Sequence, residues 1–373
     1  MEEIKNGAVT EETAEDTEQR ENLEEMFQDL EKVIMAMEDS DVTLEKSFDL
    51  YNRGMELLKK CNRTIDEVEK KVLVLDEDGE THEYQKRVES IEEILKRYLP
   101  AREGYQEIIT EAMEYSLMAG GKRLRPMLMR ESYELFGGKG RLVEPFMAAI
   151  EMIHTYSLVH DDLPAMDNDD YRRGRKTTHV VYGEDMGILA GDALLNYAFE
   201  TACTAFDLEP EHSLLIGKAL QILARKAGIF GMLGGQVVDV KESGHRITGD
   251  VLDFIYRLKT GALIESSVMI GAVLAGASDS ETAEIENIAA KVGMAFQIQD
   301  DILDVTSTTE MLGKPVHSDE KNEKTTYVTL KGLDEAGKEV ERLTSEALCG
   351  LSGLGHENEF LEALLKWLVY REK

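Results

Sequence analysis

The sequence of 373 residues is poor in cysteine and in positive charge. Its three cysteines, Cys61, Cys203 and Cys349, are odd in number and lie too far apart for a zinc motif. This usage argues against a disulfide framework and suits a reducing cytoplasm. Lysine and arginine total 42 against 74 aspartates and glutamates, which gives a formal net charge of −32. Because this charge repels nucleic acid and anionic membranes, we expect no direct binding of the bulk surface to either.

Long apolar runs are also missing. No stretch reaches the roughly 18 apolar residues that a membrane-spanning helix needs, and the nearest approach, residues 261–277, contains Glu265. Residues 1–20 are acidic and lack the basic-then-apolar order of a secretory signal. We therefore expect a cytoplasmic protein with no membrane segment.

The sequence has only six prolines and shows no alternating short strands. Apolar residues instead recur at intervals of three and four, which is the period of a helix face. Long helices are expected over residues 145–162, 187–206, 214–233, 251–276 and 281–304. Several of these segments are apolar on more than one side, so the prediction is an all-α protein whose main part is a large bundle with buried central helices.

Three parts follow one another along the chain. Residues 1–20 have almost no apolar content and predict a disordered acidic tail. Residues 21–79 carry two apolar stripes, the second with nearly the 3.5-residue period of a coiled-coil seam, and predict a helical hairpin. A hairpin this short cannot bury both stripes alone, so we expect it to need a partner surface. The acidic "LDEDGE" marks a boundary, and the bundle occupies residues 81–373.

Two apolar helices each deliver a pair of carboxylates. "EPFMAAIEMIHTYSLVH" leads to Asp161 and Asp162, and "MAFQIQDDILD" carries Asp300 and Asp304 on one helical face. Ionised carboxylates repel one another unless a hard cation lies between them, and oxygen ligands with open positions suit Mg²⁺ bound through substrate phosphates. A lone acidic pair usually lies on a solvated surface, but two pairs that end apolar helices near basic residues predict a magnesium–diphosphate site.

Asp161 and Asp167 are six residues apart, which would separate them by about 120° on an ideal helix. They can bind one ion only if the helix deforms. Pro164 is expected to cause this, since it removes a backbone donor and disturbs the preceding turn.

Basic residues accompany the acids. In "AGGKRLRP" the residues Lys122, Arg123 and Arg125 follow two glycines, so that backbone N–H groups and guanidinium groups can converge on a phosphate. Further cations follow apolar runs elsewhere: Arg172, Arg173, Lys259 and Lys314. This amount of positive charge predicts two anionic groups rather than one. By itself His154, on the helix before Asp161, is more typical of a core histidine.

Five motifs occur in order: "GGKRLRP", "HDDLPAMDNDDYRRG", "GQVVD", "LKTGALI" and "FQIQDDILDV". Together they resemble the trans-isoprenyl diphosphate synthases, specifically bacterial farnesyl diphosphate synthases, over about residues 81–373. The resemblance implies an all-α isoprenoid-synthase fold and a homodimer formed through this domain. It also implies head-to-tail condensation of isopentenyl diphosphate with dimethylallyl and geranyl diphosphates to give farnesyl diphosphate.

The resemblance assigns roles to residues. It implies about three Mg²⁺ ions on the allylic diphosphate, with Asp161, Asp167 and Asp300 as ligands and with Asp162, Asp301 and Asp304 acting nearby or through water. Isopentenyl diphosphate is expected to bind Gly121, Lys122, Arg125, His154 and Arg173. The allylic diphosphate is expected to bind Arg172, Lys259 and Lys314, with Thr260 and Gln297 lining its site. The three metal ligands, Arg172, Lys259 and Lys314 form the predicted catalytic set.

Product length is predicted from Tyr156, which lies five residues before Asp161, or about 7.5 Å along a helix axis. A growing chain that descends along this helix would meet the ring as a floor. An aromatic residue here resembles the class that makes the C15 product. A longer-chain, geranylgeranyl diphosphate synthase is the alternative.

The hairpin has a resemblance of its own. "LEEMFQDLEKVIMAMEDSDVTLEKSFDLYNRGMELLKKC" and "VEKKVLVLDEDGE" resemble the small subunit of exodeoxyribonuclease VII over residues 20–80. The resemblance implies a non-catalytic module that contacts the large nuclease subunit through residues 21–79. Two alternatives stay open: the hairpin packs on the synthase or on a second copy, or the protein is chiefly a nuclease-scaffolding subunit. A terpene cyclase needs only one diphosphate, and the basic "GGKRLRP" argues against it.

Overall fold

The computed structural model describes residues 32, 50, 53–54, 82–306 and 325–370. Contacts divide the chain into two compact units, Met1–Ile65 and Asp66–Lys373. The predicted tail, nearly all of the predicted hairpin and its boundary near Gly79 lie outside the described residues. Within the hairpin, Lys32, Leu50 and Arg53–Gly54 are described and helical.

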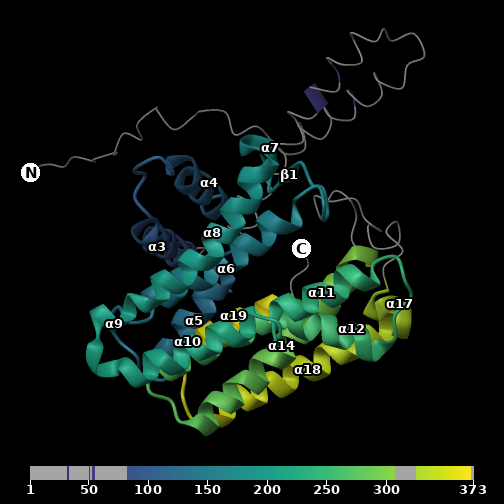
Figure 1. Cartoon of the computed structure of the whole chain (residues 1–373). Coiled ribbons are helices and arrows are strands. Elements are labelled where there is room, and N and C mark those ends of the chain that lie inside the picture. The colour runs from purple at the N-terminus through teal and green to yellow at the C-terminus, as the bar shows by residue number, and fades with distance from the viewer. Residues whose placement is uncertain (1–31, 33–49, 51–52, 55–81, 307–324, 371–373) are drawn as a thin grey trace, which may run out of the picture. The chain divides into compact units, whose positions relative to one another are not determined.

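The second unit is built of helices, as the sequence predicts (Figure 1). Their order begins with α3 (His82–Tyr98), α4 (Glu107–Leu117), α5 (Leu124–Leu135), α6 (Glu144–Asp161), α7 (Thr178–Tyr182), α8 (Glu184–Cys203), α9 (Ala205–Leu208), η1 (Pro210–His212) and α10 (Ser213–Ala227). It continues with α11 (Met232–Glu242), α12 (Gly249–Ile255), η2 (Tyr256–Gly261), α13 (Ala262–Leu274), α14 (Asp279–Thr306), α17 (Tyr327–Lys331), α18 (Leu333–Gly353) and α19 (Glu359–Tyr370). In the described part of the chain, the strands are confined to a short antiparallel pair, β1 (Tyr171–Arg172) and β2 (Arg175–Lys176).

Two helices form the centre of the core. Every residue of α13 except Met269 is buried, and α6 is buried along most of its length, from Pro145 to Val159. A helix that is apolar all round must be covered on every side. Accordingly, α13 packs against α5, α10 and α14, while α6 lies beside α8 and α5 (Figure 1). The prediction of buried central helices is confirmed.

Close packing of α13 on α5 depends on Gly271. A Cβ atom there would overlap the backbone carbonyl of Met129 and approach the backbone nitrogen of Tyr133 to 2.8 Å. The seryl hydroxyl of Ser132 donates to the carbonyl of Val268 across the same contact (2.7 Å). These contacts hold the middle and second half of α5, a helix that begins within the "GGKRLRP" motif, against the centre of the bundle.

Within the described residues, no helix is both long and apolar enough to cross a bilayer.

Candidate active site

A cavity of about 500 Å³ lies beside the C-terminal end of α6. Its walls are largely apolar and include Leu158, Leu163, Met166, Ile188, Met232 and Leu233. Its polar lining is formed by Arg125, His154, Ser157, His160, Asp161, Gln236, Lys259 and Thr260. Six of the residues predicted from the sequence therefore line one cavity: Arg125, His154, Tyr156, Asp161, Lys259 and Thr260.

A second cavity of about 220 Å³ adjoins the first at Lys259, which lines both. Its other walls include Asp239, Gln297, Asp300 and Asp301. The two predicted acidic motifs thus border neighbouring spaces that share one lysine.

The first acidic motif is shaped by the end of its helix. The helix α6 ends at Asp161, and the chain turns back so that the Asp167 N–H donates to the Asp161 carbonyl (2.8 Å). The Asn168 N–H donates to the Leu163 carbonyl (3.1 Å), and Asn168 adopts a left-handed backbone with φ of 56°. The sequence predicted that the helix deforms near Pro164, and in the structure it ends there. The turn that follows brings the backbones of Asp161 and Asp167 together despite their spacing of six residues.

Asp161 is a carboxylate in a poorly solvated place. Burial, the largest cause, together with the negative charge of Asp167 outweighs the attraction of Lys259 and raises the pKa of Asp161 to about 6. The Gln236 side-chain amide donates to Asp161 Oδ1 (2.6 Å) and holds it in place. A cluster of oxygen ligands in which the charged form is disfavoured fits a hard divalent cation, so this site matches the chemistry of Mg²⁺.

Asp162 is held by an arginine of the β-hairpin. Its side chain is buried and accepts hydrogen bonds from Arg172 Nε (2.8 Å) and Nη2 (2.6 Å). Burial raises the pKa of Asp162, while the Arg172 guanidinium opposes that rise. Because both contacts end on the same oxygen, Oδ1, the Asp162 carboxylate orients Arg172, and its action near the metal or through water stays a prediction.

A π-helical turn presents Lys259 and Thr260. The turn η2 interrupts the helical run between α12 and α13, and such π-bulges occur frequently at functional sites. Its backbone lies against Gly235 of α11, where a Cβ atom would come within 2.8 Å of the Lys259 Cα. Glycine in "GGQVVD" is therefore required for this approach, and it places α11 directly beside the turn.

Hydrogen bonds connect this turn to the acids around it. Lys259 Nζ donates to Asp239 Oδ2 (2.5 Å). Thr260 Oγ1 donates to Gln297 Oε1 (3.1 Å), and the Gln297 amide nitrogen donates to Asp300 Oδ2 (3.2 Å). The predicted residues Thr260, Gln297 and Asp300 therefore form one hydrogen-bonded chain across η2 and α14, and Lys259 pairs with Asp239 of α11.

Asp301 joins three elements. It is buried, and its Oδ2 accepts from the Tyr256 hydroxyl (2.6 Å) and from the backbone N–H of Tyr327 (2.6 Å). These bonds tie α14 to η2 and to the start of α17. Asp301 thus supports the position of Asp300, and its predicted role near the metal or through water stays a prediction.

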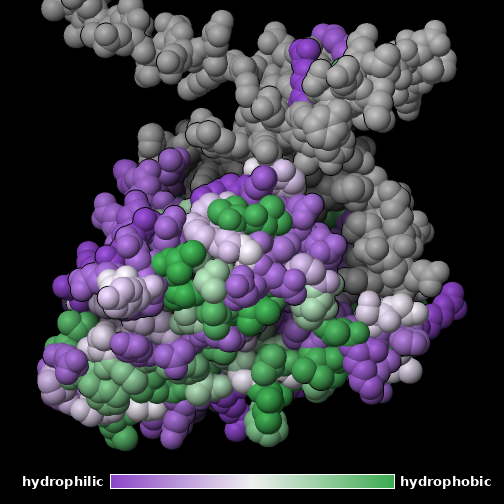
Figure 2. Space-filling model, turned by 45° about the horizontal axis from the view of Figure 1, so that its top comes forward, coloured by the Kyte–Doolittle hydropathy of each residue, from purple (hydrophilic) through white to green (hydrophobic). Residues whose placement is uncertain are grey.

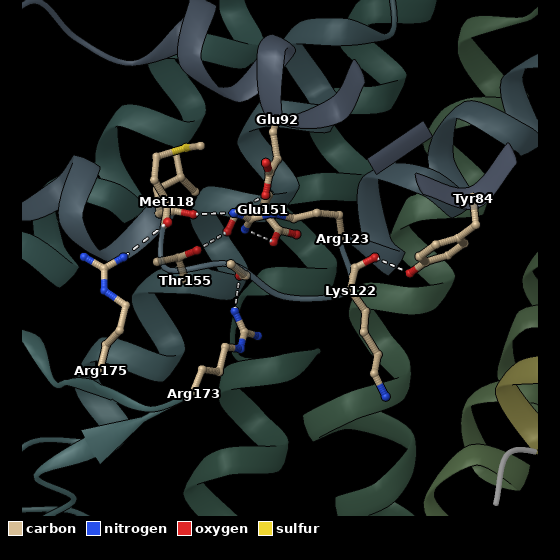
Figure 3. Close-up of polar contacts among 11 residues, drawn as sticks. Tyr84, Glu92, Met118, Lys122, Arg123, Glu151, Thr155, Arg173 and Arg175 are labelled. Atoms are coloured by element: carbon tan, nitrogen blue, oxygen red, sulfur yellow. Dashed lines mark hydrogen bonds and ion pairs between the residues drawn. The ribbon is translucent and has the colours of Figure 1, made fainter. Parts of the chain in front are cut away.

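The two arginines of the "GGKRLRP" loop have different surroundings: Arg123 is paired inside the fold, and Arg125 lines the cavity. Arg123 is buried, pairs with Glu151 (2.8 Å) and donates to the Leu117 carbonyl (2.9 Å), while Lys122 points away from this ion pair (Figure 3). The expectation that Arg123 joins Lys122 and Arg125 at a phosphate is therefore wrong. An arginine buried beside a glutamate serves the fold, since breaking such a pair leaves an uncompensated charge.

Arg173 reaches the same loop from the β-hairpin. Arg173 and Gly174 have φ angles of 51° and 69°, as a two-residue type I′ turn requires. From this turn the Arg173 guanidinium donates to the Gly120 carbonyl (Figure 3). Gly121 has a φ of 121°, and a Cβ atom there would overlap the same guanidinium. Gly121 therefore permits the contact between the loop and Arg173.

His154 and Arg125 lie among like charges. Burial, followed by the nearby Arg125 and Arg173, holds the pKa of His154 well below its ordinary value. Burial also lowers the pKa of Arg125 to about 10, with Arg173 acting in the same direction. The Nε atom of Arg125 is buried without a hydrogen-bond partner among the described residues. This group of cations around a neutral imidazole is suited to an anion.

Tyr156, which the sequence predicts as a floor for the growing chain, lies in the wall of the larger cavity. Its side chain is 7 % exposed, lines the larger cavity and meets the His160 ring edge-on at a centroid distance of 5.8 Å. Burial, reinforced by Asp161, raises the pKa of its hydroxyl, so the ring remains neutral.

Three residues escaped the sequence-based assignment: Gln236, Asp239 and Tyr256. Gln236 and Asp239 lie three positions apart, so they share one face of α11, and that spacing was the available signal. Nothing in the sequence near Tyr256 indicated a bond to Asp301, which is 45 residues away. Lys314 lies outside the described residues, and its role stays a prediction.

Comparisons with known proteins show which families the chain resembles. Residues 106–357 match the family model of the polyprenyl synthetases, and residues 24–74 match that of the exonuclease VII small subunit, so the chain is the predicted fusion. A geranylgeranyl diphosphate synthase of Cyanophora paradoxa is 46% identical over 72% of this chain and 88% of its own. A farnesyl diphosphate synthase of Geobacillus stearothermophilus is 45% identical over 68% and 84%. The solved structure of an FPP/GFPP synthase from Zymomonas mobilis is 32% identical, has a TM-score of 0.68 and covers 77% of this chain and 97% of its own.

Proposed function

This chain belongs to the polyprenyl synthetase family, and we propose that it makes farnesyl diphosphate. It is a prenyltransferase that condenses isopentenyl diphosphate with allylic diphosphates. The observation that carries the proposal is the arrangement around Lys259, which lines both the cavity of Asp161 and that of Asp300. Carboxylates and a lysine at the mouth of an apolar cavity suit a diphosphate ester with a hydrocarbon tail.

Asp161, Asp167 and Asp300 are the proposed ligands of Mg²⁺. Magnesium held there would neutralise the negative charge that grows on the departing pyrophosphate. Arg172 and Lys259 add fixed positive charge at the same place, and Lys314 is proposed to do so. The allylic C–O bond then breaks heterolytically, both bonding electrons leave with the pyrophosphate, and no protein nucleophile is required.

Isopentenyl diphosphate is proposed to bind the cations of the "GGKRLRP" loop and the β-hairpin, of which Arg125 lines the same cavity as Asp161. Lys122, Arg125 and Arg173 bind its diphosphate beside the neutral His154, and the Gly121 backbone lies close to it. Its double bond attacks the allylic carbocation, which forms the new C–C bond. A proton then leaves the carbon next to the resulting cation and passes to the released pyrophosphate, so that charge and atoms balance.

Product length is proposed to depend on Tyr156. Its buried ring lies on the wall of the cavity that begins at Asp161, where it would stop a chain of limited length. Geranylgeranyl diphosphate, the product named for the Cyanophora relative, is the alternative.

Product analysis tests both statements. Purified protein with Mg²⁺, dimethylallyl diphosphate and isopentenyl diphosphate should give mainly the C15 product, and Tyr156→Ala should give longer chains because the floor is removed. Tyr156→Phe is the matched control, since it keeps the ring, and it should retain the parent product. A C20 product from the parent would support the alternative, and an unchanged product from Tyr156→Ala would contradict the role of the ring.

A homodimer formed through the synthase domain is part of the proposal. Large apolar side chains are exposed along α8 and α11, including Ile188, Leu189, Leu233 and Val237. Hydrophobic residues gather in patches on the face seen in Figure 2. Exposed apolar patches of this kind mark interaction surfaces. Sedimentation of the full chain at a mass near twice 41.9 kDa would support the dimer, and sedimentation as a monomer would contradict it.

A second function is proposed for the N-terminal part, on the strength of the match over residues 24–74. Residues 21–79 would bind a large subunit of exodeoxyribonuclease VII in the cytoplasm, without contacting nucleic acid themselves. Co-purification of such a subunit with the full chain, and its loss on deleting residues 1–79, would support this role. Retention of the subunit by the deleted chain would exclude the hairpin as its binding site.

A further inference from the structure

The last helix of the described chain reaches the proposed isopentenyl diphosphate site. Trp367 of α19 is the single tryptophan of the protein, and its ring lies 5.4 Å from the Lys122 ammonium. The Tyr84 ring packs against Trp367 at a centroid distance of 6.4 Å. The Tyr84 hydroxyl in turn donates to the Lys122 carbonyl (2.6 Å; Figure 3). Lys122 is thus contacted at its backbone and at its ammonium by two aromatic residues that also touch each other.

The geometry points to Trp367 as a positioning residue for isopentenyl diphosphate, an inference that rests on the proposed function of Lys122. A lysine ammonium within about 6 Å of an indole face is attracted by the ring quadrupole. The ring takes one side of the ammonium, so the remaining N–H donors face away from it and toward an anion. Without the ring, the flexible four-carbon stem of Lys122 would have to be ordered by the diphosphate itself.

The effect should be confined to one of the two substrates. Trp367 contacts Lys122 and Tyr84, whereas the allylic site is built from Asp161, Lys259 and their partners on α6, α11 and η2. Removal of the indole therefore changes the binding of isopentenyl diphosphate and leaves the ionisation of the allylic ester unchanged.

Steady-state kinetics of the full chain test this split. Trp367→Leu should raise the KM for isopentenyl diphosphate by about threefold to tenfold, with kcat and the KM for the allylic substrate unchanged. Trp367→Phe should recover part of the loss, because phenylalanine keeps a weaker aromatic face.

Phe360→Leu is the matched control on the same helix. The Arg87 guanidinium lies over the Phe360 ring, 3.9 Å from its centroid, and Arg87 also pairs with Glu131. This cation–π contact therefore lies outside the proposed site. The control should keep the parent KM values. An equal rise in KM for Phe360→Leu, or a fall in kcat without a rise in KM for Trp367→Leu, would overturn the inference.

Intrinsic fluorescence gives a second measurement that needs no turnover. Because the protein has one tryptophan, titration with isopentenyl diphosphate alone should change its emission, and Lys122→Ala should remove the response. A silent titration at concentrations that saturate turnover would overturn the inference while the condensation stands. Absence of condensation in the parent protein would instead reject the proposed function.

Discussion

The proposed site has an acidic half around Asp161 and a basic half around Arg125 and His154, and burial shifts the pKa values of the two halves in opposite directions. Around the end of α6, burial and neighbouring acids raise the pKa of Asp161 to about 6, so its negative charge is held at a cost. About two turns earlier on the same helix, burial and neighbouring arginines lower the pKa of His154 and bring that of Arg125 to about 10. The acidic half therefore disfavours the ionised form of its carboxylate, and the basic half disfavours the protonated forms of its histidine and arginine.

This contrast indicates how each substrate is bound. Unbalanced carboxylates are relieved by a divalent cation, so we propose that the allylic diphosphate binds through metal. Unbalanced cations are relieved directly by an anion, so we propose that isopentenyl diphosphate binds without metal. The comparison predicts that the two halves can be disabled separately.

The largest effect is expected for Asp161→Asn. The amide cannot replace the carboxylate at Mg²⁺, so kcat should fall by about a hundredfold or more, as losses of transition-state charge stabilisation do. Initial rates at saturating substrates measure this. The change of tryptophan fluorescence on adding isopentenyl diphosphate should persist in the variant and in parent protein treated with a chelator. Loss of that response in either case would break the division into two halves.

A smaller effect is expected for Arg125→Gln. It removes a charge-assisted contact from the metal-free half, so the KM for isopentenyl diphosphate should rise by about tenfold to a hundredfold. The KM for the allylic substrate should stay within about twofold, which competition assays with both substrates will show. Arg130→Gln, a charge change on the same helix away from the cavity, is the matched control. Equal changes for the two substrates would argue against the separate sites.

The smallest effect concerns pH and His154. Its folded pKa lies below the unfolded value of about 6.5, so stability is fully present above that pH and falls as pH drops below it. His154→Gln should therefore lose about 1 kcal/mol less stability than the parent between pH 7.5 and 5.5. Urea unfolding at both pH values measures the difference. A parent protein with identical acid sensitivity to the variant would show that His154 is not held neutral by its surroundings.

Local pattern was sufficient for much of the fold. The period of the apolar residues predicted α6, α13 and α14, because a helix that is buried must carry apolar residues at every turn. It also predicted that the helix must change after Asp161, since proline limits what the backbone can do. The match of residues 24–74 supports the hairpin module, whose partner remains a proposal.

Long-range contacts were out of reach of such patterns. Arg123 and Arg125 are the same amino acid two positions apart, yet Arg123 pairs with Glu151 and Arg125 lines the cavity. Asp301 resembles Asp300 in the motif, but only its neighbours show that it bonds Tyr256 and Tyr327.

By itself, the sequence determined that this protein is helical, that its acids end two apolar helices, and that enough positive charge exists for two diphosphates. Those properties depend on neighbours one or two turns away, which are visible in the order of residues. Only the tertiary structure decided which charged side chains are paired inside the fold and which face a cavity. It also placed Trp367 of α19 beside Lys122. The physical reason is that hydrogen bonds and ring contacts act over a few ångströms in space, across separations of hundreds of residues in the chain.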